Sequence, residues 1–104
     1  MSFRPIQTEV DQWVSQFREG YFEPLPMLAR LTEEVGELAR VIMHRFGGKK
    51  PKPGEDAGEL GDEIADAMFV LVCLANSQQI DLDEAFAKMM AKFRSRDADR
   101  WTPK

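Results

Sequence analysis

The sequence contains a single cysteine and a single histidine among its 104 residues. One thiol cannot form an internal disulfide, so Cys73 indicates a reducing compartment and is interpreted as a small buried hydrophobe. A lone imidazole excludes a di-iron helical bundle, because that site needs Glu-x-x-His on two helices. We interpret His44 as a residue near a helix C-terminus, where it interacts with the helix dipole.

Long apolar runs and an excess of basic residues are also missing. No segment reaches the roughly 18 apolar residues of a membrane span, and MSFRPIQTEV has no apolar run of signal-peptide length. The 14 Lys and Arg against 18 Asp and Glu give a net charge of −4, which argues against a nucleic-acid polymer as partner. We expect one domain, residues 1–104, that is soluble and cytoplasmic and has no membrane partner.

Strand-like alternation of useful length is absent, and helical periodicity takes its place. Apolar residues recur at steps of three and four over about 5–19, 26–46, 59–77 and from 82 onward. Prolines in GYFEPLP and the stretch GGKKPKPGEDAGE separate the first three segments, and Asp81 with Glu84 resembles a capping box that opens the fourth. The prediction is an all-α, four-helix domain whose second and third helices form a central antiparallel pair.

The third segment ends in AMFVLVCLA, which is apolar on every side. Such a pattern predicts a helix that is buried all round. A chain of this length buries only a modest fraction of its surface, so association with other copies would extend the core.

Acidic residues interrupt the faces that these helices should bury. At about 100° per residue, Glu34 and Glu37 flank the stripe that begins at Leu31, whereas Glu33 points outward. Glu63 and Asp66 continue the face that Val70 and Leu74 occupy one and two turns later. Buried carboxylates are costly unless they are paired or bind a metal, and no basic residue stands in register to neutralise all four.

Two antiparallel helices that each offer carboxylates at i and i+3 can converge on one oxygen-rich site. Hard cations such as Mg²⁺ or Mn²⁺ prefer oxygen ligands and keep waters that substrate phosphates displace. The pattern therefore predicts a divalent-cation site between the two central helices.

The same residues resemble a known family. EEVGE at 33–37 and EIAD at 63–66 resemble the EExxE…ExxD signature of the MazG-like nucleotide pyrophosphohydrolases. KFRSR at 92–96 resembles the Lys-Phe-x-x-Arg motif that is found after the fourth helix in MazG proteins. The run from FREGYF to RDADRW is similar to the short, single-domain MazG-like proteins of bacilli, so the resemblance covers most of the chain.

The resemblance implies hydrolysis of a (deoxy)nucleoside triphosphate to a monophosphate and pyrophosphate, in a role such as cleansing the nucleotide pool. It implies Mg²⁺, with Mn²⁺ as a substitute, and a homodimer or homotetramer. The acids that match the family's metal ligands are Glu34, Glu37, Glu63 and Asp66. The alternatives are a phosphoribosyl-ATP pyrophosphohydrolase and a helical oligomer that binds cations without turnover.

Further residues have two interpretations each. Glu33 is the candidate catalytic base or a solvated charge, and Lys92 with Arg96 are phosphate contacts or a solvated basic helix end. Asn76 contacts substrate or caps its own helix, and Lys49, Lys50 and Lys52 are a mobile loop that closes over phosphates or stays in solvent. Trp13, Tyr21, Phe22 and Trp101 can stack on a base, but aromatic residues at helical spacing are more often part of a core, and Trp101 stands out because it lies in a polar tail.

Overall fold

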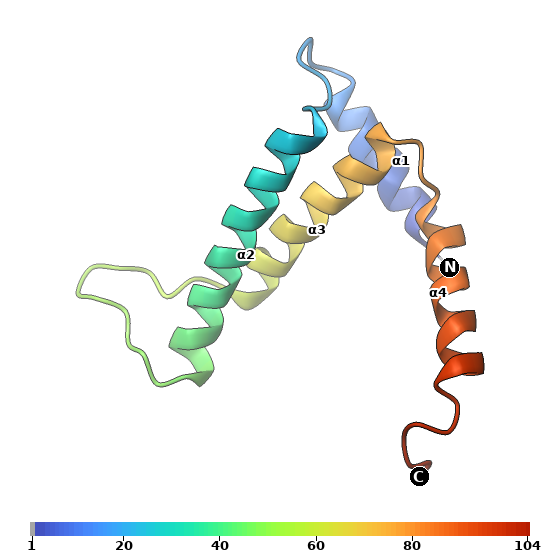
Figure 1. Cartoon of the computed structure of the whole chain (residues 1–104). Coiled ribbons are helices and arrows are strands. Elements are labelled where there is room, and N and C mark those ends of the chain that lie inside the picture. The colour runs from blue at the N-terminus through green and yellow to red at the C-terminus, as the bar shows by residue number, and fades with distance from the viewer. Residues whose placement is uncertain (1) are drawn as a thin grey trace.

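The computed structural model describes residues 2–104, which form four helices and no strand (Figure 1). The helices are α1 (Phe3–Val14), α2 (Pro24–Phe46), α3 (Leu60–Ser77) and α4 (Leu82–Arg96). None of them is long and apolar enough to cross a membrane. The predicted all-α, four-helix fold is confirmed.

The helices α2 and α3 run antiparallel and make the largest helix–helix contact (Figure 1). Their shared core lies toward the start of α2 and the end of α3, where Met27, Val70 and Cys73 are buried. The burial of Cys73 agrees with its interpretation as a hydrophobe. Half-buried apolar and aromatic residues surround this core: Val10, Val14, Tyr21, Leu31, Phe69 and Leu74.

One prediction about the helices is wrong in detail. The first helix ends at Val14 and not near residue 19, because the N–H groups of Gln16 and Phe17 bond three residues back, in tight turns that do not continue the α-helix. In the single chain Leu71, near the end of α3, keeps 47% of its surface exposed, so the burial of this helix all round stays a prediction.

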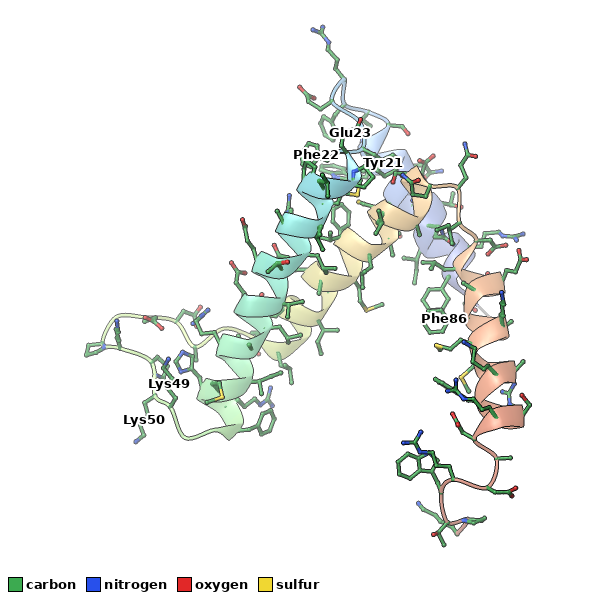
Figure 2. The ribbon with its side chains drawn as sticks, viewed as in Figure 1. Tyr21, Phe22, Glu23, Lys49, Lys50 and Phe86 are labelled. Atoms are coloured by element: carbon green, nitrogen blue, oxygen red, sulfur yellow. The ribbon has the colours of Figure 1, made fainter. Side chains whose placement is uncertain are left out.

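The last helix, α4, packs against α1 and diverges from the α2–α3 pair (Figure 1). Asp81 caps it as predicted, accepting hydrogen bonds from the N–H groups of Asp83 and Glu84. At its start, Phe86 (Figure 2) stacks on Phe3 with ring centroids 4.5 Å apart. The direction of α4 is thus fixed by α1, while its C-terminal half extends away from the central pair.

Candidate active site

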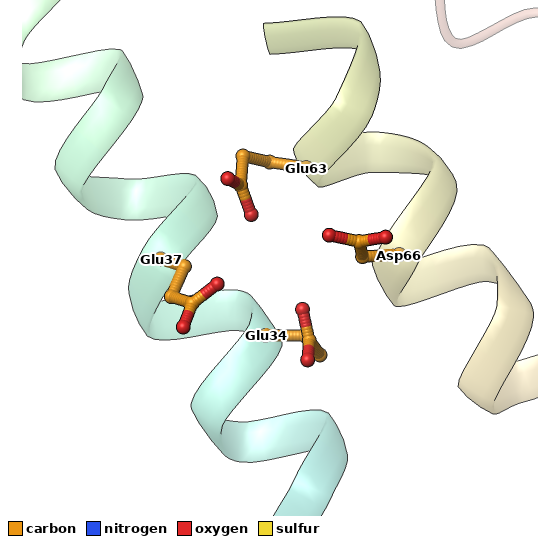
Figure 3. Close-up of side chains that lie close together, drawn as sticks. All are labelled: Glu34, Glu37, Glu63 and Asp66. Atoms are coloured by element: carbon orange, nitrogen blue, oxygen red, sulfur yellow. The ribbon is translucent and has the colours of Figure 1, made fainter. Parts of the chain in front are cut away.

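Four carboxylates converge between the central helices, as Figure 3 shows: Glu34 and Glu37 from α2, and Glu63 and Asp66 from α3. One oxygen from each lies within 4.8 Å of the others. We call these four residues the carboxylate cluster. The i, i+3 spacing turns each pair toward the facing helix, and the antiparallel arrangement brings the two pairs to the same level.

Apolar contacts hold the two helices together on either side of the cluster. On one side, Leu31 of α2 packs with Val70 of α3 in the main core. On the other side, Val41 has only 1% of its surface exposed and lies against Gly58, just before α3. The carboxylate cluster therefore occupies a short polar gap in an otherwise apolar interface. Apolar contacts on both sides of this gap hold the two helices that carry the carboxylates.

The electrostatics of the cluster are those of an uncompensated negative charge. Burial raises the pKa of Glu63, and the charges of Glu37 and Asp66 raise it further. One oxygen of Glu34 and one of Glu63 are buried without any hydrogen-bond partner. In residues 2–104, the one basic side chain within ion-pair distance of the cluster is Arg30, 3.8 Å from Glu34 and half exposed.

These observations fit a divalent cation better than any group of the chain itself. Buried, unpartnered carboxylate oxygens are unfavourable unless a cation approaches them. The donor set contains oxygen alone, which suits hard ions such as Mg²⁺, Mn²⁺ or Ca²⁺ rather than zinc. His44 lies outside the cluster, in agreement with its interpretation as a residue of the last turn of α2.

The loop between α2 and α3 is tied to the end of α2 beside the cluster. Arg40 donates a hydrogen bond to the carbonyl of Asp56 and lies 3.6 Å from the carboxylate of Glu55. His44 bonds through Nδ1 to the carbonyl of Lys49, and its Nε2 lies 3.5 Å from a carboxylate oxygen of Glu55 without forming a hydrogen bond. The lysines of this loop are exposed, and Figure 2 shows Lys49 and Lys50 on it.

A second feature is an apolar cavity of about 310 Å³ next to the cluster. Arg30 links the two sites, because it lines the cavity and pairs with Glu34. Aromatic and aliphatic side chains supply most of the wall: Trp13, Val14, Phe17, Tyr21, Phe22, Met27, Phe69, Val70 and Cys73, with Glu19 and Gly20 at its edge. Sequence reasoning considered Trp13, Tyr21 and Phe22 for stacking but missed Arg30 and Phe69, which have no signal beyond their positions on the helices.

Asn76 lies at the end of α3, in contact with α1. Its amide nitrogen donates to the carbonyl of Gln7 and to the hydroxyl of Tyr21, and its amide oxygen accepts from the Gln7 side chain. Tyr21 in turn donates to Asp11, and burial followed by this hydrogen bond raises the pKa of Tyr21 to about 12. Within the single chain, the amide of Asn76 is used to join α1 and α3.

The remaining candidates lie outside the carboxylate cluster. Glu33 is exposed on α2, on the side that the helical geometry indicates. Lys92 and Arg96 are exposed near the end of α4, where Arg96 pairs with the adjacent Asp97. Trp101, with 73% of its surface exposed, follows α4 and carries Arg100 over its ring. The chain by itself does not bring α4 or the tail to the cluster, because α4 diverges from the central pair (Figure 1).

The fold and the site together define a class: all-α proteins with an acidic, oxygen-only site between two antiparallel helices. The model of the MazG nucleotide pyrophosphohydrolase domain matches residues 22–101. The chain therefore belongs to the MazG nucleotide pyrophosphohydrolase family, and it is an enzyme of the pyrophosphohydrolase type.

Individual relatives agree with this assignment. The chain is 56% identical to YpjD of Bacillus subtilis strain 168 over 99% of its own length and 93% of that protein. It is 31% identical to dCTP pyrophosphatase 1 of Mus musculus, covering 75% of this chain but 48% of the mouse protein.

Two solved structures also share the fold. The crystal structure of YPJD from Bacillus subtilis matches with a TM-score of 0.82 and 53% identity, over 92% of this chain and 96% of that one. The structure of the Bacillus-conserved MazG protein, a nucleotide pyrophosphohydrolase, matches with a TM-score of 0.79 and 44% identity, over 95% of this chain and 96% of the other.

Proposed function

We propose that this enzyme hydrolyses (deoxy)nucleoside triphosphates between the α and β phosphates, with Mg²⁺ as the physiological cation and Mn²⁺ as a substitute. Water adds to phosphorus and the bond to pyrophosphate breaks, which yields a nucleoside monophosphate and pyrophosphate. The observation that supports this most is the carboxylate cluster, whose buried oxygens on Glu34 and Glu63 have no partner within the chain.

The proposed metal ligands are the four members of the carboxylate cluster. When bound, the cation supplies charge neutralisation for the phosphate oxygens and orients the triphosphate. The chain contributes rigid positioning, since apolar contacts at Leu31 and Val41 hold the helices on both sides of the cluster. Such preorganisation reduces the structural rearrangement needed at the moment of reaction.

We assign the role of general base to Glu33. It directly precedes the cluster residue Glu34 on α2 and has its side chain in solvent, so its carboxylate is free to accept a proton from the attacking water.

The nucleobase is proposed to occupy the apolar cavity. Its volume of about 310 Å³ and its aromatic lining suit a planar ring that stacks between side chains. Arg30 spans the distance from this cavity to Glu34, so a nucleotide can place its base in the cavity and its phosphates at the cluster. Asn76 and Trp101 remain proposed substrate contacts, although neither lines the cavity in the single chain.

The working form is proposed to be a homodimer or homotetramer in the cytoplasm. Many large apolar residues of α2 and α3 are exposed in the single chain, among them Leu28, Val35 and Met68, and a contact with another copy would cover them. The single buried thiol of Cys73 suits a reducing compartment.

A pyrophosphate-release assay over canonical and modified dNTPs, with phosphoribosyl-ATP in the same panel, tests the proposal. We expect Mg²⁺-dependent turnover of one or more triphosphates that Glu37→Gln or Asp66→Asn reduces by about 10²-fold or more. The matched control is Asp62→Asn, which removes an acid in the same turn of α3 that lies outside the cluster. Unchanged turnover in the Glu37 and Asp66 variants would refute the ligand assignment, and turnover of phosphoribosyl-ATP alone would refute the substrate class.

A further inference from the structure

We propose that Arg30 exchanges partners when the site is loaded: its guanidinium pairs with Glu34 as long as no cation is bound, and it binds the α-phosphate of the nucleotide once Glu34 holds a divalent cation. The inference rests on the proposed function, since it adds a residue to the cation and nucleotide site proposed above. Arg30 then couples the binding of the cation to the binding of the nucleotide.

Arg30 lies at the junction of the apolar cavity and the carboxylate cluster. It lines the cavity, and its Nε lies 3.8 Å from a carboxylate oxygen of Glu34, one helical turn further along α2. The facing helix repeats this arrangement, because Phe69 and Val70 of the cavity lie one turn beyond the cluster residue Asp66. One turn is about 6 Å along a helix. In a nucleotide whose base lies in the cavity, the sugar and the α-phosphate must cross this interval.

The positive charge of Arg30 has no equivalent at this junction. Among the described residues 2–104, Arg30 is both the one basic side chain that lines the cavity and the one within ion-pair distance of the cluster. Its charge acts inside the cavity as well: burial raises the pKa of the Cys73 thiol, and the charge of Arg30 offsets part of that rise. A guanidinium also presents planar donors that match the oxygens of a phosphate. Arg30 therefore has the chemistry and the position to bind the α-phosphate.

The pair between Arg30 and Glu34 is loose enough to open. Its distance of 3.8 Å exceeds that of a hydrogen bond. The Arg30 side chain is 54% exposed, so the guanidinium can turn without disturbing the core. Ion pairs of this exposed kind contribute little to stability, whereas hydrogen bonds between a guanidinium and a phosphate are among the stronger ones. Releasing Glu34 in favour of a phosphate is therefore favourable for Arg30.

The environment of Glu34 explains why a cation would trigger the exchange. Its side chain is only 13% exposed, and its second carboxylate oxygen is buried without a hydrogen-bond partner (Figure 3 shows the residue in the cluster). A divalent cation attracts this carboxylate more strongly than the single charge of Arg30 does, and it also repels the guanidinium. Arg30 would then lose its partner at Glu34 and gain one in the negatively charged α-phosphate.

The first test measures the binding of Mn²⁺ alone by calorimetry. Arg30 competes with the cation for Glu34, so Arg30→Gln should bind Mn²⁺ about 2–5-fold more tightly than the parent chain. Arg30→Lys keeps the charge and is expected to keep the affinity of the parent. Arg45→Gln is the matched control, because it removes the same charge from the end of α2, outside the cluster and the cavity. Equal or weaker binding of Mn²⁺ by Arg30→Gln would overturn the proposal.

The second test measures the binding of the four deoxynucleoside monophosphates, with Mg²⁺ and with EDTA, by NMR titration that reaches millimolar dissociation constants. With Mg²⁺, Arg30→Gln should weaken the binding by about 10-fold or more, because ionic hydrogen bonds to the α-phosphate are lost. With EDTA, Arg30 stays with Glu34, so the same substitution should change the affinity by less than about 2-fold. An equal loss under both conditions would show that Arg30 attracts phosphate without any exchange, and the proposal would be wrong.

The matching deoxynucleosides, which lack the phosphate, identify the group that Arg30 contacts. Their affinity should be the same for the parent chain and Arg30→Gln. A loss as large as that of the monophosphates would mean that Arg30 holds the base or the wall of the cavity, and it would contradict the proposal. Glutamine has nearly the helix propensity of arginine, so the variant should fold, and its thermal unfolding followed by circular dichroism checks this.

Failure of the proposed function has a different signature. A parent chain that binds a monophosphate in the predicted way but releases no pyrophosphate from any triphosphate refutes the proposed activity and leaves the exchange of Arg30 supported. A parent chain that releases pyrophosphate, but whose affinity for Mn²⁺ and for monophosphates does not depend on Arg30, supports the activity and refutes the exchange. A parent chain that binds no monophosphate with Mg²⁺ also refutes the exchange.

Discussion

Gly58 stands so close to Val41 that a Cβ atom added to the glycine would lie 2.9 Å from Cγ2 of Val41 and 3.9 Å from Oε1 of Glu63. The contact joins the end of the interhelical loop to the C-terminal part of α2, five residues before the cluster residue Glu63. Gly58 also has a φ of +82°, a conformation that other residues adopt only with strain.

Gly58→Ala is expected to destabilise the protein by about 2–4 kcal/mol, because it adds both backbone strain and a clash with a buried side chain. Gly54→Ala is the matched control, since Gly54 has a φ of +81° but no atom within 4 Å of the added Cβ, and should cost only about 1 kcal/mol. Urea unfolding of both variants measures the difference. Equal losses would show that the Val41 contact contributes nothing.

Neutralising one member of the carboxylate cluster should have opposite effects with and without metal. Glu63→Gln removes a charge from a group whose pKa is raised by burial and by Glu37 and Asp66, so the metal-free variant should melt a few degrees higher than the parent chain. Its further stabilisation by added Mg²⁺ should be small, because a ligand has been lost. Melting curves with EDTA and with Mg²⁺ test both statements, and a lower metal-free melting temperature would contradict the first.

Asn76→Ala should lower the free energy of unfolding by about 1–3 kcal/mol, because Gln7 and Tyr21 lose their shared partner at the α1–α3 contact. Comparing stability with KM separates this role from substrate binding. A higher KM at a temperature where the variant is fully folded would show that Asn76 also touches the nucleotide. An unchanged KM would confine it to joining the helices.

The raised pKa of the Tyr21 phenol leads us to expect that the protein loses stability at high pH. Burial and the hydrogen bond to Asp11 raise its pKa to about 12 from an ordinary value of 10.0. The unfolded chain therefore ionises first, and the contribution of Tyr21 is complete below pH 10 and is lost as the pH rises toward 12. Urea unfolding at pH 8 and pH 11 should show a steeper loss in the parent chain than in Tyr21→Phe, and parallel losses would exclude Tyr21 as the cause.

The sequence predicted the parts of this molecule that depend on local periodicity. Helical spacing fixes which side of α2 carries Glu34 and Glu37 and which side of α3 carries Glu63 and Asp66, so their convergence follows once the helices pair antiparallel. The cap at Asp81 and the burial of Cys73 follow from equally local rules. The roles of these residues in metal and substrate binding stay predictions.

The parts that escaped prediction depend on contacts between distant residues. The direction of α4 is set by Asp83 and Gln7 bonding across some 75–80 positions of sequence, and no periodic pattern encodes such a contact. The helix α1 ends early because the chain around Ser15 forms tight turns. The apolar residue Phe17 continues the helical spacing of the sequence, so the spacing alone predicts a longer helix. The cavity beside Arg30 is likewise assembled from three helices and a connecting segment.

The divergence of α4 from the central helix pair has a consequence for how activity depends on protein concentration. Because α4 diverges from α2 and α3, large apolar residues of that pair stay exposed in the single chain, and the proposed contact with another copy would cover them. Turnover per mole of chain should then fall on serial dilution, with a midpoint at the dissociation constant of the pair, and a covalent tether between two chains should abolish that fall.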